Sequence, residues 1–275
     1  MLGRIMQAST RPVGELLRAW RNHRRLSQLD LALEAEISTR HLSFVETGRS
    51  LPSRDMVLHL AERLDVPLRE RNLLLHAAGY APVYPERPLG DPALGAGREA
   101  VELLLKGHEP YPALAVDRHW TLVAANEAVG RLLGGADPAL LRPPVNVLRL
   151  SLHPAGLAAR IVNLAEWRSH LLARLRQQID VSADPVLVEL MGELRGYPVP
   201  DRGGVGAGEH DDVAAVVVPL RLATDGGVLS LFSATTVFGT PVDVTLAEIA
   251  LETFFPADAA TADALRRTGS ALPRQ

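Results

Sequence analysis

Residues 27–52 read SQLDLALEAEISTRHLSFVETGRSLP and contain two short helical patterns joined by a tight turn. The Ser27 hydroxyl can accept a hydrogen bond from the amide of Asp30, and Ser38 can cap the second helix in the same way. The segment between the two helices, residues 35–37, has the length of the turn in a helix-turn-helix. Gly48 can end the second helix because glycine readily adopts a left-handed backbone conformation. The stretch therefore predicts a helix-turn-helix motif.

The second helix of this motif has two different sides. Ile37, Leu42 and Val45 fall on one side at helical spacing, and we expect them to pack. The opposite side carries the residues Thr39, Arg40, Ser43, Phe44 and Thr47. Arg40 has the donor fork that matches guanine, and Thr39 and Ser43 can donate or accept. Phe44 is the exception, for which a thymine methyl group would be an apolar partner. Double-stranded DNA is therefore the expected partner.

Several of these residues resemble the XRE family of bacterial DNA-binding domains. The resemblance rests on Gln28 after the capping serine, on Glu46-Thr47-Gly48 and on Pro52. It implies that Ser27 and Gln28 hold phosphate or an outer base, and that Arg49 and Arg54 lie near the DNA backbone. Phe44 departs from the family, which usually has a polar residue there. The candidate DNA-binding residues are Ser27, Gln28, Ser38, Thr39, Arg40, Ser43, Phe44, Thr47, Arg49 and Arg54. The alternative is a helical bundle with no role in nucleic-acid binding.

The charge distribution supports a division of the chain. Residues 1–80 hold 12 Arg, no Lys and 9 acidic residues, a net charge of +3, and the remainder holds 17 basic and 23 acidic residues, a net charge of −6. Only the N-terminal part is thus attractive to phosphate. Because +3 is modest, we expect two copies to bind DNA together as a homodimer.

Composition limits the other possibilities. A chain of 275 residues suggests two domains, and the absence of cysteine excludes disulfides and thiolate chemistry. No apolar run approaches the roughly 20 residues of a membrane span, and the N-terminus lacks the apolar core of a signal peptide. We expect a cytoplasmic protein without membrane insertion, with a flexible start over residues 1–12.

Prolines and glycines mark the boundary between the two expected domains. They gather between residues 81 and 97, where they disfavour a helix or a central strand. We expect a helix-turn-helix domain over 13–79, built from helices at 13–23, 27–34, 38–47, 53–64 and 67–78. A linker over 80–98, a ligand-binding domain over 99–260 and a C-terminal helix end and tail over 261–275 would follow.

The second domain combines helices with strands. We expect helices at 98–106, 127–133, 157–179 and 184–194, and strands at 113–117, 121–125, 213–223, 228–237 and 246–255. Thr224-Asp225-Gly226-Gly227 is a strong hairpin signal. The fold class is thus an all-α N-terminal helix-turn-helix domain of five helices plus an α+β domain with a five-stranded antiparallel sheet, covered on one side by helices. The strand, turn, strand, Asn126-capped helix order resembles the start of a PAS domain.

The C-terminal motifs also resemble a specific family. Asn146-Val147-Leu148, His153-Pro154, the run 163–167 (NLAEW), Phe238-Gly239-Thr240-Pro241 and the run 254–258 (FFPAD) are similar to the ligand-binding domain of MmyB-like transcription regulators. The resemblance covers about residues 99–265. It implies a PAS-like pocket that can hold a fatty-acid chain, so a small apolar ligand is the second expected partner.

The candidate ligand-binding residues are Trp120, Arg149, Arg160, Trp167 and Arg168. An arginine could pair with a ligand carboxylate through two hydrogen bonds, and the tryptophans could form pocket walls. Each arginine could instead lie at the surface or in an ordinary salt bridge, and each tryptophan could be plain core.

No set of residues predicts catalysis. Glu166 and His170 lie one helical turn apart without a third metal ligand, 209–212 (EHDD) reads as an exposed turn, and His153 has no second feature that would support a haem site. We therefore expect no enzyme activity, no metal and no cofactor. The leading hypothesis is a DNA-binding transcription regulator that senses a small apolar ligand. The alternatives are a regulator whose second domain only dimerises, and an enzyme tethered to DNA.

Overall fold

The chain forms two compact units in the computed structural model, which describes residues 11–198, 217–239, 241 and 243–270. Unit 1 comprises residues 1–88 and 240–247, and unit 2 comprises residues 89–239 and 248–275. Each unit has its own apolar core among the described residues. The expectations for residues 1–10, 199–216 and 271–275, including the turn at 209–212 and the start of the strand at 213, lie outside the described residues.

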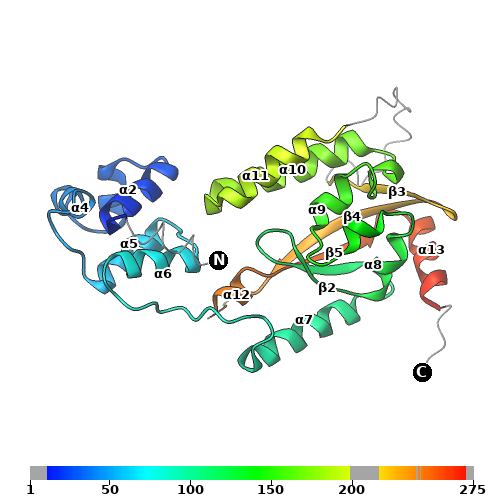
Figure 1. Ribbon diagram of the computed structural model, residues 1–275, viewed down its shortest axis with the longest axis horizontal. Helices are drawn as coiled ribbons and strands as arrows, with labels where there is room; N and C mark the ends of the chain where they lie inside the picture. Colours follow the sequence, from blue (N-terminus) through cyan, green and yellow to red (C-terminus); the bar gives the residue numbers. More distant parts are fainter. Residues whose placement is uncertain (1–10, 199–216, 240, 242, 271–275) are drawn as a thin grey trace. The chain divides into compact units, whose positions relative to one another are not determined.

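Unit 1 is helical, and the five expected helices are confirmed (Figure 1). They are α2 (Val13–His23), α3 (Gln28–Glu34), α4 (Thr39–Glu46), α5 (Arg54–Arg63) and α6 (Leu68–Ala77). The hydroxyls of Ser27, Ser38 and Ser53 each accept a hydrogen bond from the amide three residues ahead, which caps α3, α4 and α5. Fully buried leucines, among them Leu17 and Leu42, fill the space between the helices.

A buried ion pair joins three of these helices. Nε and Nη2 of Arg21 on α2 donate to the two carboxylate oxygens of Glu46 at the end of α4, at 2.6 and 2.9 Å. The amide of Gln28 on α3 donates to the same carboxylate at 2.8 Å. The Glu46 side chain is 1% exposed, and its hydrogen bond raises the pKa of Arg21. Close packing accompanies the pair, since a Cβ on Gly14 would stand 2.2 Å from the carbonyl oxygen of Val45.

Residues that follow the helices also pack in unit 1. The side chain of Asn72 accepts hydrogen bonds from the amides of Val83 and Tyr84. Further along the chain, the amide of Val244 donates to the carbonyl of Pro85, and Arg87 pairs with Asp243 at 3.1 Å. Residues Val244–Ala247 form the short helix α12. The strand expected from residue 246 is therefore wrong at its start, because this segment is helical and the strand begins at Ala250.

Unit 2 contains the expected five-stranded antiparallel sheet. The strands are β1 (Ala113–Val116), β2 (Leu122–Ala125), β3 (Leu220–Thr224), β4 (Gly227–Val237) and β5 (Ala250–Pro256), in the order β2-β1-β5-β4-β3. The hairpin predicted at 224–227 joins β3 to β4, with Gly227 at a φ of 115°. The strand expected from residue 213 begins at Leu220, since residues 217–219 are not in a strand.

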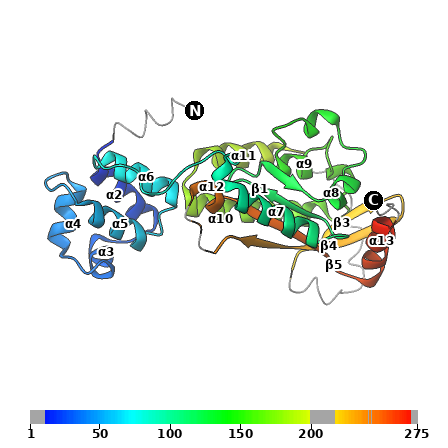
Figure 2. The same ribbon diagram turned by 90° about the horizontal axis from the view of Figure 1, so that it is seen from below.

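Helices cover both faces of the sheet (Figures 1 and 2). One face carries α7 (Gly95–Gly107). The ring of His108, the residue that follows α7, lies edge-on to the ring of Phe255, with 4.8 Å between the ring centroids. The other face carries α9 (Val147–Leu152), α10 (Leu164–Ser182) and α11 (Pro185–Gly196). In addition, α8 (Glu127–Leu132) lies near β1, and α13 (Ala259–Ser270) packs against β4 and β5. The expectation of helices on one face only is therefore wrong.

Tertiary contacts explain why α10 starts later than expected and why Asn126 does not cap α8. The helix expected over 157–179 begins at Leu164, because Ile161 forms a β-bridge with Leu222 and the side chain of Asn163 bonds the backbone of Pro219 and Arg221. Asn126 precedes α8, but its side chain makes no capping bond. It accepts instead from the amide of Ala113. The first helix of the unit starts at Gly95, three residues before the expected Arg98.

We expect Glu46→Ala to destabilise unit 1 by about 3–5 kcal/mol, because it leaves the buried Arg21 guanidinium without its partner. Hydrogen exchange of the amides of residues 13–77 in the full chain measures the change. Glu15→Ala is the matched control, since its pair with Arg11 is exposed and 3.8 Å long and should contribute less than about 1 kcal/mol. Equal protection in the two variants would contradict a structural role for the buried pair.

Candidate functional site

The outward side of α4 carries the predicted reading residues. Arg40 and Thr47 are exposed, whereas Thr39, Ser43 and Phe44 are partly buried. On the inward side Leu42 and Val45 are buried. The structure thus places Thr39, Arg40, Ser43 and Phe44 on one short helix, with Arg49 in the exposed turn that follows it.

Phe44 has partners within the protein. The guanidinium of Arg40 lies over its ring at 5.3 Å from the centroid, and that of Arg49 lies at 5.9 Å. Such cation–π contacts hold both arginines beside the ring. The sequence suggested a thymine methyl group as the partner of Phe44, whereas the structure shows the guanidinium groups of Arg40 and Arg49 near its half-buried ring.

The remaining predicted DNA-binding residues have local tasks. The Ser27 hydroxyl caps α3 together with Asp30, and these hydrogen bonds lower the pKa of Asp30. Gln28 donates to Glu46, and the Thr47 hydroxyl donates to the carbonyl of Ser43 at 2.7 Å. Ser38 caps α4 and is exposed, as is Arg54 at the first position of α5. The structure therefore leaves Arg40, Arg49 and Arg54 as the exposed cations of the predicted set.

Unit 2 contains a partly open apolar cavity of about 100 Å³. It lies between the sheet and the helices α8, α9 and α10, and its walls include Trp120 and Trp167, which are also buried members of the apolar core. Among the described residues that line it, all are apolar except Ser151, Arg174, Ser233 and Glu252.

The periodicity of the strands and of α10 determines which of their side chains form the cavity walls. Leu114 on β1 is paired with Glu252 on β5, and Ser233 on β4 is paired with Phe254, so these side chains share one face of the sheet. Opposite them, α10 presents Trp167, Leu171 and Arg174 at the i, i+4 and i+7 positions of a single helix face. The cavity is thus the gap between one sheet face and one helix face.

Arg174 and Glu252 form a paired charge at the cavity wall. The guanidinium donates to both oxygens of Glu252, at 3.0 and 2.5 Å, and to the hydroxyl of Thr235 at 2.8 Å. The Arg174 side chain is 23% exposed and the Glu252 side chain 5%. Arg174 also lies over the Trp120 ring at 5.1 Å. Sequence reasoning missed this arginine, although its spacing from Trp167 on a helix could have indicated it.

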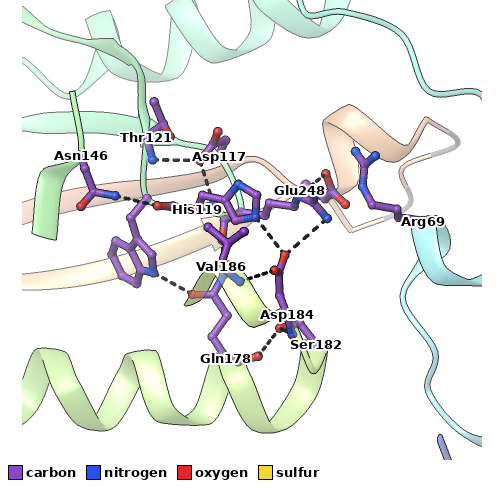
Figure 3. Close-up of polar contacts among 12 residues, drawn as sticks. Arg69, Asp117, His119, Thr121, Asn146, Gln178, Ser182, Asp184, Val186 and Glu248 are labelled. Atoms are coloured by element: carbon purple, nitrogen blue, oxygen red, sulfur yellow. Dashed lines mark hydrogen bonds and ion pairs between the residues drawn. The ribbon is translucent and has the colours of Figure 1, made fainter. Parts of the chain in front are cut away.

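Figure 3 shows the turn that contains Asp117, His119 and Thr121, and Trp120 belongs to the same turn. Trp120 has a φ of 64°, a left-handed conformation that is uncommon for a bulky residue. The carboxylate of Asp117 accepts from the amides of His119 and Thr121, and the indole nitrogen donates to Gln178 at 2.7 Å. These bonds hold one cavity wall against α10.

The three predicted ligand arginines do not line the cavity. Arg149 makes a two-pronged pair with Glu193, which lowers the pKa of that carboxyl. Arg160 donates to the carbonyls of Leu132, Gly134 and Ala223. Arg168 donates to the carbonyls of Leu194 and Arg195. Each guanidinium is therefore already bonded to protein acceptors.

The residues weighed as metal or haem ligands have other surroundings. The described part of the chain contains no group of three or more His, Asp or Glu residues placed to hold a metal ion. His153 accepts from the amide of Ala155 and lies edge-on to the ring of Tyr197, and His170 stacks on Trp167. Burial, followed by the charge of Arg174, lowers the pKa of His170. No helix within the described ranges is both long and apolar enough for a membrane span.

Comparison with known proteins identifies both parts of the chain. Residues 98–267 match the family model of the MmyB-like transcription regulator ligand binding domain, and residues 12–74 match that of a helix-turn-helix domain. No curated protein matches the chain. A solved structure titled "Structure of an RNA-binding Light-Oxygen-Voltage Receptor" matches at 14% sequence identity with a TM-score of 0.26. That match covers 96% of this chain and 65% of the other, so the chain spans less than two thirds of that protein's length.

The two family matches agree with the geometry. The helix-turn-helix match contains α4 with its exposed Arg40, and the ligand-binding match contains every wall of the apolar cavity. The second match alone covers more than half of the 275 residues. The chain therefore belongs to the MmyB-like transcription regulator ligand-binding family and carries a helix-turn-helix domain ahead of that domain.

Proposed function

We propose that this protein is a regulator of the XRE type that binds a DNA operator as a homodimer and changes its DNA binding when a small apolar ligand enters unit 2. The apolar cavity, in a chain that also carries a helix-turn-helix, is the observation that carries the proposal. Dimeric helix-turn-helix proteins read half-sites about 34 Å apart, so a change in dimer geometry alters the simultaneous fit of both copies. Regulation requires different ligand affinities in the two dimer geometries.

On the DNA side, the proposal assigns base reading to α4. Arg40 is the exposed guanidinium on that helix, and Thr39 and Ser43 lie on its outward side. Arg49 and Arg54 are assigned to phosphates, because they lie on the exposed turn after α4 and at the start of α5. Ser27, Gln28, Ser38 and Thr47 flank this surface. Phosphate contacts position the domain, and base contacts make it specific.

On the ligand side, a fatty acid is the ligand class that the sequence resemblance implied. Burial of a methylene contributes about 0.8 kcal/mol, so a chain of about a dozen would gain roughly 10 kcal/mol before ordering costs. The cavity of about 100 Å³ is smaller than the roughly 150 Å³ that accepts benzene in a protein core. A compact ligand therefore fits with small adjustments, and a long chain requires the lining to move apart.

We expect Arg40→Ala to lose about 1–3 kcal/mol of binding free energy on an operator selected from random duplexes, and to relax one base position. The loss follows from removal of a two-pronged contact with a base edge. Fluorescence anisotropy with the selected duplex and with its single-base variants measures both effects. An equal loss on random DNA would show that Arg40 does not read bases.

Arg49→Ala provides the contrasting result. It should weaken binding to all duplexes alike and flatten the slope of log affinity against log salt by about one, because one phosphate contact is lost. Binding titrations over a salt series measure that slope. An unchanged slope would mean that Arg49 does not touch phosphate.

Leu114→Trp should fill the cavity from β1 and remove the response of DNA binding to ligand, while operator affinity without ligand stays the same. Native mass spectrometry of protein purified from cells, under mild and then denaturing conditions, detects the retained molecule. Leu103→Trp is the control, because Leu103 is 73% exposed on α7. Retention of the same molecule by both variants would place the ligand outside the cavity.

A further inference from the structure

The polar end of the ligand is constrained by the charges at the cavity wall. Arg174 and Glu252 are the charged residues among the described residues of the lining. Their charges cancel, and Glu252 occupies two donors of the guanidinium. The cavity therefore presents a cation that is already paired.

A ligand carboxylate has no unused cation at this wall. To form the same two-pronged pair with Arg174 it would have to displace Glu252, whose side chain is 5% exposed. The displaced carboxylate would then lie unpaired in an apolar wall, and loss of one partner from a buried pair is strongly unfavourable. If Glu252 stayed in place, the incoming carboxylate would itself be buried without a counter-ion beside a like charge. Both arrangements weaken the binding of an anionic ligand.

A ligand whose polar end is uncharged avoids both of these energetic costs. The Ser151 hydroxyl accepts a hydrogen bond from the indole of Trp167 at 3.0 Å, and its own hydrogen is left to donate. Ser233 contributes a second hydroxyl to the lining. A hydroxyl, ester or amide group can bond to such hydroxyls while the ion pair remains intact.

We propose that the cavity selects apolar ligands with an uncharged polar end over carboxylates of the same chain length, and that Glu252 is the residue that sets this selectivity. The inference rests on the proposed function, since it describes the ligand of that same cavity. It also narrows the class of ligand in that proposed function, because a free fatty acid becomes a poorer ligand than the corresponding alcohol, ester or amide.

Paired probes of equal chain length test the selectivity. The probes are 1-octanol and octanoate, measured on the full chain at neutral pH by displacement of the neutral fluorescent dye N-phenyl-1-naphthylamine. The wild type should bind octanol at least about tenfold more tightly, a difference of about 1.4 kcal/mol. Glu252→Gln should abolish or invert that preference through a gain in octanoate affinity, because it removes the competing charge and leaves Arg174 available.

Two further variants make the result specific. Glu193→Gln removes the acid from the Arg149 pair outside the cavity, and should leave the preference unchanged. The double variant Arg174→Met with Glu252→Leu replaces the pair by apolar side chains, which proteins often tolerate, and should retain octanol binding and the preference for it. If Glu252→Gln does not fold, the comparison of octanol with octanoate on the wild type still decides whether the cavity prefers the uncharged end.

The outcomes separate the inference from the function on which it rests. Equal or tighter binding of octanoate by the wild type would overturn the inference and leave the apolar site standing. A preference for octanol that persists unchanged in Glu252→Gln would overturn the role of Glu252. Failure of the dye, octanol and octanoate alike to bind the wild type would overturn the proposed apolar site, and the inference with it.

Discussion

The register of β5 between β1 and β4 determines what the second unit can enclose. The pairings of Glu252 with Leu114 and Thr235, and of Phe254 with Ser233, put these side chains on the face that meets α10. A slip of one residue would exchange the two faces of the strand and would bring Leu251 and Thr253 to the cavity. The apolar walls, the ion pair of Arg174 with Glu252 and the position of that pair beside Trp120 all depend on this alignment.

A second buried ion pair has a comparable place in the first unit. Glu46 ends the helix that carries Arg40, and it receives hydrogen bonds from Arg21 on α2 and Gln28 on α3. The end of α4 is thereby fixed against two other helices, while its outward side remains available. In both units a carboxylate with almost no exposure holds a helix in position, through Glu46 in one and Glu252 in the other.

Local signals predicted much of the fold. Serine caps, the glycine hairpin at 224–227 and apolar periodicity located the helices of unit 1 and the hairpin of unit 2, because these features act over a few residues. The errors occurred where distant backbone groups decide the structure. Asn163 bonds to the backbone around β3, and α12 packs with residues near Pro85. The late start of α10 and the helix at 244–247 therefore depend on residues far away in the sequence and could not be predicted from the residues next to them. The same distinction holds for the cavity. The tryptophans could be identified as wall candidates by their size. The ion pair of Arg174 could not be predicted, because its partner Glu252 lies on a strand 78 residues further along the chain.

The chain between β4 and β5 crosses from one unit to the other and back. Residues 240–247 belong to unit 1, with Asp243 bonded to Arg87 and Val244 fully buried, yet the strands on either side of them line or support the cavity of unit 2. A fragment that ends at residue 88 would therefore lack the contacts of Asp243 and Val244 with residues 85–87, although the apolar core of α2–α6 is built from residues 13–83. Deletion of residues 240–247 would also break the connection between β4 and β5, the two longest paired strands of unit 2. Unit 1 is thus assembled from two stretches of chain that lie about 150 residues apart in the sequence.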